Sequence, residues 1–263
     1  MTPPSITFLG SGGAFAPIGR GHSSMLLQSN EHRLLIDCGG SVQFTLGQDH
    51  GLNPGDIDGI WISHLHADHI GSMEWFALYR HFLPNKSPDG SEIKPMLLTG
   101  PGIKDLLWNS SLRGGLEYLE NKKMRLDDYF NCVELGLEKF ILWQGLRLYP
   151  FRTYHMRQDD GAYVPSFGVY IINTETGRST LVTTDTSFQP ALFSNAYEAS
   201  DQIFHDCETL DTKSGVHAHY DELKTLPLEI KRKMRLYHHW NTRKDWGMEG
   251  FAGFVGTGDG YLL

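Results

Sequence analysis

Four side chains of metal-binding types lie within six consecutive residues of this chain, in the segment His64-Leu65-His66-Ala67-Asp68-His69. Residues 58–63, directly before them, form an apolar run that predicts a buried β-strand. Residues 71–83 have the spacing of an amphipathic helix that stops before Pro84. We expect the chain to fold so that more distant ligands reach this loop, because four groups from one short loop cannot surround an ion by themselves.

The chemistry of this segment favours two ions rather than one. In an extended His-x-His pattern, the imidazoles of His64 and His66 point the same way and can bind one ion. Asp68 and His69 offer a second pair of ligands, so we expect a second ion nearby. Zinc fits nitrogen and oxygen ligands of this kind, and manganese or iron are alternatives. Burying four such groups for a purely structural purpose would be costly, which also favours metal binding.

Later groups of similar chemistry also follow strand-like segments. These segments are residues 178–183 before Asp185, residues 202–204 before His205 and Asp206, and residues 234–237 before His238 and His239. Ligands that are far apart in the sequence can therefore meet at one edge of a sheet assembly.

Length and composition limit the class of protein. The chain has 263 residues and no evident linker, so we expect one domain over residues 1–263, with residues 84–140 as a lid or insertion. No apolar run approaches the roughly 20 residues of a membrane span, and the N-terminus lacks the features of a signal peptide, which predicts a cytoplasmic protein without membrane contact. Cys38, Cys132 and Cys207 are odd in number and form no C-x-x-C pattern, which argues against a disulfide framework.

The net charge also limits the partners. The chain has 23 basic and 31 acidic residues, a net charge of −8. A protein with this net charge has no overall positive electrostatic field that would attract a long polyanion. Any nucleic-acid substrate should therefore be small or locally held.

These motifs resemble the metallo-β-lactamase superfamily, whose motif is H-x-H-x-D-H, and within it the branch of ribonuclease Z-like phosphodiesterases. Residues 8–13, Phe-Leu-Gly-Ser-Gly-Gly, resemble the opening strand and glycine loop of that superfamily. Leu35-Ile-Asp-Cys-Gly39 resembles its first motif, whose aspartate, here Asp37, supports the metal loop. The resemblance covers nearly the whole chain and implies an α/β fold, the αββα sandwich of two mixed sheets packed face to face with helices outside.

The resemblance also implies the remaining ligands. His155 matches the lone histidine of the third motif, and Asp185 in Thr-Thr-Asp-Thr matches the bridging aspartate, although Thr184 replaces the usual glycine. The fifth motif has a histidine, an aromatic residue, two small polar residues and an arginine, which His239-Trp-Asn-Thr-Arg243 matches. Adjacent side chains of an extended segment point in opposite directions, so we expect His239 rather than His238 to face the metals.

The implied centre contains two divalent ions. Its ligands are His64, His66 and His155 for one ion, Asp68, His69 and His239 for the other, and Asp185 with a hydroxide as bridges.

The same resemblance implies the reaction, in which the bridging hydroxide attacks a phosphodiester and a histidine acts as general acid. The segments His-Asp-Cys-Glu and Gly-Val-His-Ala-His match the parts that supply this acid. We assign His217 as the general acid and Asp206 as its acidic partner, with His219 and Glu208 as the respective alternatives. Asp68 counts as catalytic as well as a ligand.

The prediction of the substrate rests on less direct observations. Only 30 residues separate His155 from Asp185, too few for the transfer-RNA-binding arm that bacterial ribonuclease Z carries there. We therefore expect a phosphodiesterase acting on a small phosphodiester such as a cyclic nucleotide, with long nucleic acid unfavoured. Alternatives are a tRNA 3′-processing-type endoribonuclease and a lactone or other carbon-ester hydrolase, and the least favoured is a non-catalytic binding module. Homodimers are common among proteins of this kind, so a homodimer is a further expectation.

Overall fold

The computed structural model describes residues 3–240 and 249–263. Within these residues, the first of two seven-stranded sheets has the order β10-β7-β4-β3-β2-β1-β18. Its strands are β1 (Ser5–Gly10), β2 (Ser24–Ser29), β3 (His32–Ile36), β4 (Gly59–Ile62), β7 (Met96–Thr99), β10 (Asn131–Glu134) and β18 (Gly260–Leu262). The strands β3, β4, β7 and β10 pair in parallel with one another, whereas the pairings of β18 with β1, β1 with β2 and β2 with β3 are antiparallel, so the sheet is mixed.

The second sheet has the order β11-β12-β13-β14-β15-β16-β17. Its strands are β11 (Ile141–Trp143), β12 (Leu146–Arg152), β13 (Phe167–Asn173), β14 (Ser179–Val182), β15 (Gln202–Asp206), β16 (Met234–Tyr237) and β17 (Gly253–Phe254). β14, β15, β16 and β17 pair in parallel, and β12 runs in the same direction because both its pairing with β13 and that of β13 with β14 are antiparallel. The carboxyl ends of β12, β14, β15 and β16 therefore meet at one edge.

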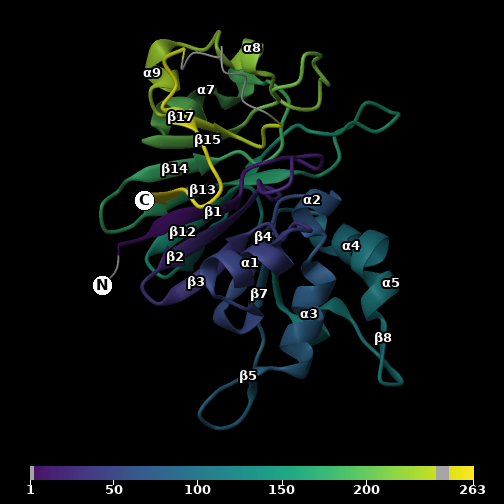
Figure 1. Cartoon of the computed structure of the whole chain (residues 1–263). Helices are drawn as coiled ribbons and strands as arrows, with labels where there is room; N and C mark the ends of the chain where they lie inside the picture. Colours follow the sequence, from purple (N-terminus) through teal and green to yellow (C-terminus); the bar gives the residue numbers. More distant parts are fainter. Residues whose placement is uncertain (1–2, 241–248) are drawn as a thin grey trace.

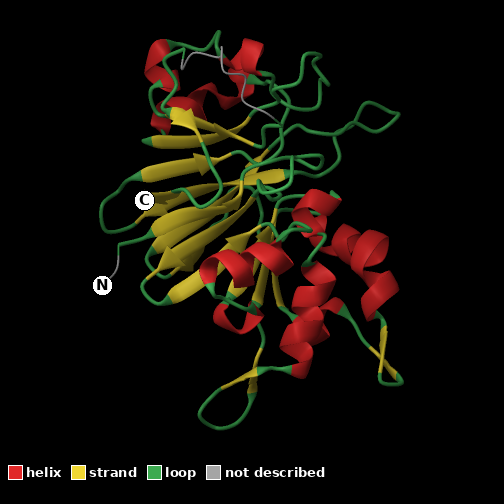
Figure 2. Ribbon diagram, in the orientation of Figure 1, coloured by secondary structure: helices red, strands yellow, loops and turns green. Residues whose placement is uncertain are grey.

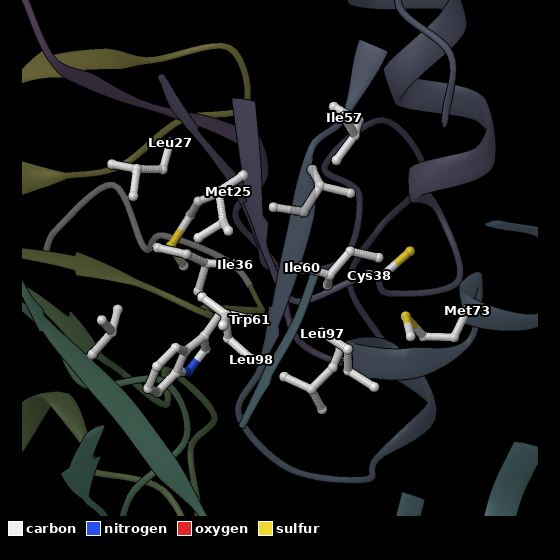
Figure 3. Close-up of a cluster of buried hydrophobic side chains, with 14 of the residues drawn as sticks. Met25, Leu27, Ile36, Cys38, Ile57, Ile60, Trp61, Met73, Leu97 and Leu98 are labelled. Atoms are coloured by element: carbon white, nitrogen blue, oxygen red, sulfur yellow. The ribbon is translucent and has the colours of Figure 1, made fainter. Parts of the chain in front are cut away.

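Aromatic contacts hold the two sheets face to face. Phe8 of β1 packs against Phe204 of β15 and Tyr237 of β16, with ring centroids 5.1 and 5.4 Å apart. Trp61 of β4 is fully buried, and its indole N–H donates to the Phe167 carbonyl oxygen at 3.5 Å. Figure 3 shows Trp61 among apolar side chains of the first sheet. Burial of such surface, at about 25 cal/mol per Å², is the main force that joins the layers.

Helices lie outside the sheets, with α1 to α5 beside the first sheet and α7 to α9 beside the second (Figures 1 and 2). The helices are α1 (Val42–His50), α2 (Ala67–Ile70), α3 (Met73–Phe82), α4 (Ile103–Leu107), α5 (Arg113–Leu116), α6 (Leu126–Tyr129), α7 (Pro190–Ala199), α8 (Tyr220–Leu223) and α9 (Leu228–Lys231), with a 3-10 turn at Pro54–Asp56 and a π turn at Trp108–Leu112. The predicted α/β sandwich is confirmed. No helix in the described part of the chain is both long and apolar enough to cross a membrane.

Residues 84–140 belong largely to the first layer. They supply β7 and β10 to its sheet, and they form two small hairpins, β5 (Asn85–Lys86) with β6 (Glu92–Ile93) and β8 (Tyr118–Leu119) with β9 (Lys122–Lys123). None of the residues lining the cavity described below comes from this stretch. That the chain forms one domain, and that residues 84–140 act as a lid or insertion, stay predictions.

Candidate metal centre and active site

The first group of candidate ligands combines the loop after β4 with two segments of the second sheet. Its members are His64, His66, His155 and Asp185, whose ligand atoms lie within 4.8 Å of one another. His155 follows β12 and Asp185 follows β14, so both strands deliver their residue to the edge where β4 ends. The ring nitrogens His155 Nε2 and His66 Nδ1 are 3.1 Å apart, a spacing that one shared cation would explain.

The second group shares Asp185 with the first. It contains Asp68, His69, Asp185 and His238, again within 4.8 Å of one another. His238 Nε2 lies 3.3 Å from Asp68 Oδ2 and 3.3 Å from Asp185 Oδ1. A carboxylate shared by two sets of three ligands is the arrangement that a pair of bridged ions requires.

Buried polar atoms show that these residues fit metal ions. His64 Nε2, His69 Nε2 and both carboxylate oxygens of Asp185 are buried and have no hydrogen-bond partner among the described residues. An unpaired buried polar atom costs about 1–3 kcal/mol, so four that converge on one place need a ligand. The donors are imidazole nitrogen and carboxylate oxygen, which suit zinc, manganese and iron. The chain thus holds a binuclear His/Asp metal site.

Asp37 fixes the ligand loop. It accepts hydrogen bonds from the Ser63 backbone N–H at 2.8 Å, the Ser63 hydroxyl at 2.7 Å and His69 Nδ1 at 2.7 Å. His155 Nδ1 likewise donates to the Val216 carbonyl oxygen at 2.8 Å. Hydrogen bonds of this kind select the tautomer and direct the other ring nitrogen toward the metal.

The structure places His238, rather than the expected His239, among these ligand atoms. His238 faces the other ligands, whereas His239 Nε2 lies 3.2 Å from the Val255 carbonyl oxygen and its Nδ1 contacts the Arg20 guanidinium. The alternation rule assumed an extended backbone, but β16 ends at Tyr237 and His238 has a left-handed φ of 63°. Positions 241–243 of the predicted motif lie outside the described residues.

Thr184 occupies a position that favours glycine. Its φ is 54°, in the left-handed region, which explains why the resembled motif has glycine before the aspartate. The turn aims Asp185 into the site, and here a β-branched residue accepts the strained conformation.

A histidine–aspartate pair lies beside the metal ligands. His217 Nδ1 is 2.8 Å from Asp206 Oδ2, and the hydroxyl of Thr183 accepts the Asp206 backbone N–H at 3.0 Å. Asp206, His217, Asp185 and His238 form a third group with ligand atoms within 4.8 Å.

The electrostatics of this pair follow from burial and charge. Burial raises the pKa of Asp206, but the charge and hydrogen bond of His217 outweigh it and bring that pKa to about 2. Burial lowers the pKa of His217, but the Asp206 charge prevails, so the pKa is raised. Asp185 behaves like Asp206, since His238 and His69 hold its pKa well below the ordinary value despite burial. The carboxylates of the site are therefore ionised at neutral pH.

The alternative residues, His219 and Glu208, form hydrogen bonds with backbone groups instead of contacting the metal ligands. His219 caps α8, with Nδ1 accepting the Asp221 backbone N–H at 3.1 Å, and its Nε2 donates to the Leu210 carbonyl oxygen at 2.8 Å. Glu208 lines the cavity, but its Oε2 accepts the Ser214 backbone N–H at 2.8 Å. His217 and Asp206 are thus the two that the fold brings to the metal ligands.

A cavity of about 650 Å³ opens onto both ligand groups. Besides site residues, its wall contains Phe15, His22, Leu210 and Trp240. Sequence reasoning missed Phe15 and His22, because they lie in loops where no motif or strand-end pattern singles them out. The cavity is large enough for a small-molecule ligand.

Two mixed sheets with a shared His/Asp centre at their edge define a metal-dependent hydrolase of the metallo-β-lactamase fold. Residues 4–261 match the family model described as Anti-Pycsar protein Apyc1, and the chain belongs to that family. It is 31% identical over 268 residues to the Anti-Pycsar protein Apyc1 of Bacillus phage vB_BveM-Goe7, covering 98% of each chain. It is 33% identical over 271 residues to that of Bacillus phage 010DV004, also covering 98% of each.

Solved structures agree on the fold. The metallo-β-lactamase fold protein YhfI of Bacillus subtilis has a TM-score of 0.71 at 16% identity and covers 99% of each chain. Human tRNase Z, short form, has a TM-score of 0.67 at 19% identity and covers 98% of each chain. The predicted metallo-β-lactamase fold is confirmed, and the family to which the chain belongs is Apyc1. At these identities the likeness to tRNase Z extends to the fold alone.

Proposed function

We propose that the chain hydrolyses a small cyclic-nucleotide phosphodiester, with His217 as the proton donor to the leaving oxygen. The observation that carries this is the 2.8 Å contact of His217 Nδ1 with Asp206 beside the shared ligand Asp185. Phosphodiester cleavage produces an alkoxide, which benefits from a positioned acid. Membership of the family supports the proposal, since Apyc1 is an anti-Pycsar protein that degrades cyclic-nucleotide signals.

We further propose the ligand sets. His64, His66 and His155 hold one ion, Asp68, His69 and His238 hold the other, and Asp185 bridges them. Zinc is the proposed metal, with manganese or iron as alternatives. Two divalent ions in such sites would lower the pKa of a water molecule and neutralise charge on phosphate oxygens.

The chain's own residues handle the proton. Asp206 accepts from Nδ1 of His217, which leaves Nε2 as the nitrogen that can carry a proton to the substrate. Water adds to phosphorus and gives up one proton to solvent, the ester P–O bond breaks, and the leaving oxygen takes a proton from His217. Solvent then returns a proton to His217, so the ring is ready for the next turnover. Asp206 stabilises the protonated ring before this transfer and orients it throughout.

His217→Ala tests the role of this residue. We expect kcat on cyclic nucleotides to fall about 10²–10⁴-fold, the usual contribution of a general acid. His219→Asn is the matched control, because asparagine also caps a helix, and it should leave kcat nearly unchanged. An equal loss in both variants would contradict the assignment.

A substrate panel separates the alternatives. The metal-loaded protein should cleave cyclic nucleotides but not short RNA, a lactone or a β-lactam. Cleavage of the lactone that survives His217→Ala would instead favour a carbon-ester hydrolase, and preferential RNA cleavage would favour an endoribonuclease. Failure on every phosphodiester would overturn the proposal. A homodimer and a cytoplasmic location stay predictions.

A further inference from the structure

Two aromatic rings stand exposed at the cavity wall. The side chains of Phe15 and Trp240 are 77% and 39% exposed, although both line the cavity. Their ring centroids are 6.1 Å apart, and the planes are tilted by 49°. Exposed apolar groups gathered at one place in this way usually mark a binding surface.

The backbone ties both rings to the metal centre. Trp240 is two residues after the ligand His238, whose backbone N–H donates to the Ser11 carbonyl oxygen at 2.8 Å. Phe15 is two residues after Gly13, and a Cβ on Gly13 would lie only 2.8 Å from His238 Cε1. The aromatic pair, Phe15 and Trp240, is therefore carried by the two segments that meet at His238.

The wall of the cavity that these rings line is mainly apolar. Leu210, Val216 and Met156 also line the cavity. Glu208, an acidic lining residue outside the proposed metal ligands, has Oε2 bound to the Ser214 backbone N–H at 2.8 Å. A planar ligand group would meet ring and aliphatic surfaces, which favour stacking over recognition of hydrogen-bonding edges.

We propose that the aromatic pair is the seat of the nucleobase, which stacks on Trp240 or Phe15 while the phosphodiester lies at the His/Asp centre. This inference rests on the proposed function, because it takes a cyclic nucleotide as the substrate. The ribose then lies between the His/Asp centre and the rings. Stacking uses the π-face that every base has, so purine and pyrimidine nucleotides should bind with similar affinity.

Binding of product-like ligands tests the seat without relying on turnover. Isothermal titration calorimetry on the metal-loaded full chain compares a nucleoside 5′-monophosphate with ribose 5-phosphate, which lacks only the base. We expect the nucleotide to bind wild type about 5- to 100-fold more tightly, the range that stacking of one base gives. Trp240→Ala and Phe15→Ala should each reduce this ratio, and the double variant should abolish it.

Two further variants keep the test specific. Trp240→Phe keeps an aromatic face and should restore most of the preference for the nucleotide. Phe44→Ala removes a phenylalanine that is 55% exposed but does not line the cavity, and should leave the ratio unchanged. With cyclic nucleotides as substrates, Trp240→Ala should mainly raise KM and change kcat little. The same variant should cleave a base-free six-membered cyclic phosphodiester as wild type does.

The outcomes separate this inference from the proposed function. A wild-type ratio near one, a ratio that the double variant keeps, or an equal loss of both ligands would overturn the nucleobase seat. Preferential nucleotide binding without hydrolysis of any cyclic nucleotide would overturn the proposed function and leave the seat standing.

Discussion

His238 and His239 are both buried, and only their contacts tell them apart. His238 touches Asp68 and Asp185, whereas His239 contacts Arg20 and the Val255 carbonyl oxygen. We expect His238→Ala to lose most of one metal equivalent and to lower kcat/KM more than about 100-fold, since even indirect supports of a metal contribute 10- to 100-fold. His239→Gln should keep two equivalents per chain by elemental analysis, and loss of metal in this variant would contradict the proposed ligand set.

Thr184 holds a conformation that its side chain disfavours. Its φ is 54°, and its buried hydroxyl has no hydrogen-bond partner among the described residues. A left-handed conformation of a non-glycine residue destabilises the folded state by about 1–3 kcal/mol. This exceeds the roughly 0.4–1 kcal/mol by which a glycine stabilises the unfolded chain through its greater backbone freedom. Thr184→Gly should therefore raise the free energy of unfolding by about 1 kcal/mol in urea.

Thr183 provides the contrast to Thr184. Its hydroxyl accepts the Asp206 backbone N–H and donates to the Thr184 carbonyl oxygen at 2.9 Å. Thr183→Val should lower the free energy of unfolding by about 1–3 kcal/mol, because it leaves a buried donor unpaired. If Thr184→Gly also unfolded at lower urea, strain at this turn would be disproved.

The His217–Asp206 pair predicts a pH dependence. The Asp206 charge raises the pKa of His217 against the effect of burial, and a general acid must carry its proton to act. Activity should therefore fall as pH rises through this raised pKa. Asp206→Asn removes the charge and should move the alkaline limb of the kcat/KM profile to lower pH. Glu208→Gln should leave that limb in place, and an equal shift there would assign the acidic role to Glu208.

At the scale of elements, the local sequence pattern predicts correctly those strands and helices whose conformation is decided by their own residues. The strand expected over residues 58–63 is β4 (Gly59–Ile62), and the helix expected over 71–83 is α3 (Met73–Phe82). The helix α4 (Ile103–Leu107) continues as a π turn, Trp108–Leu112, which no hydrophobic spacing indicates.

The turn at His238 could not be predicted in this way. Its backbone N–H bonds to Ser11, a residue more than two hundred positions earlier, and local sequence carries no trace of that contact. The same applies to Phe15, which reaches the cavity only through the fold of the loop after β1. The types of the side chains and their positions at strand ends were enough to identify most of the candidate site. Which of two adjacent residues faces the site was decided by contacts between distant parts of the chain.

The loop at the end of β1, residues 10–13, acts as a support for His238. Gly13 leaves no room for a side chain, since a Cβ would come within 2.8 Å of His238 Cε1. Gly13→Ala should push the imidazole aside and lower kcat/KM about 10- to 100-fold, because displacements below 1 Å matter at this distance from the chemistry. Gly114→Ala is the control, as its Cβ would meet nothing within 4 Å, and it should keep wild-type activity. Wild-type activity in Gly13→Ala would show that the loop is no such support.

At the scale of the whole molecule, the metal centre joins the two sheets. His64, Asp68 and His69 follow β4 of the first sheet, whereas Asp185 and His238 follow strands of the second. Because metal that binds only the folded chain stabilises it by mass action, 100-fold excess over Kd adds about 2.7 kcal/mol. For a chain of this size we expect a chelator to lower Tm by about 5–10 °C. Asp185→Asn, which alters the shared ligand, should show a much smaller shift in differential scanning calorimetry, and an undiminished shift would mean that the stabilising metal lies elsewhere.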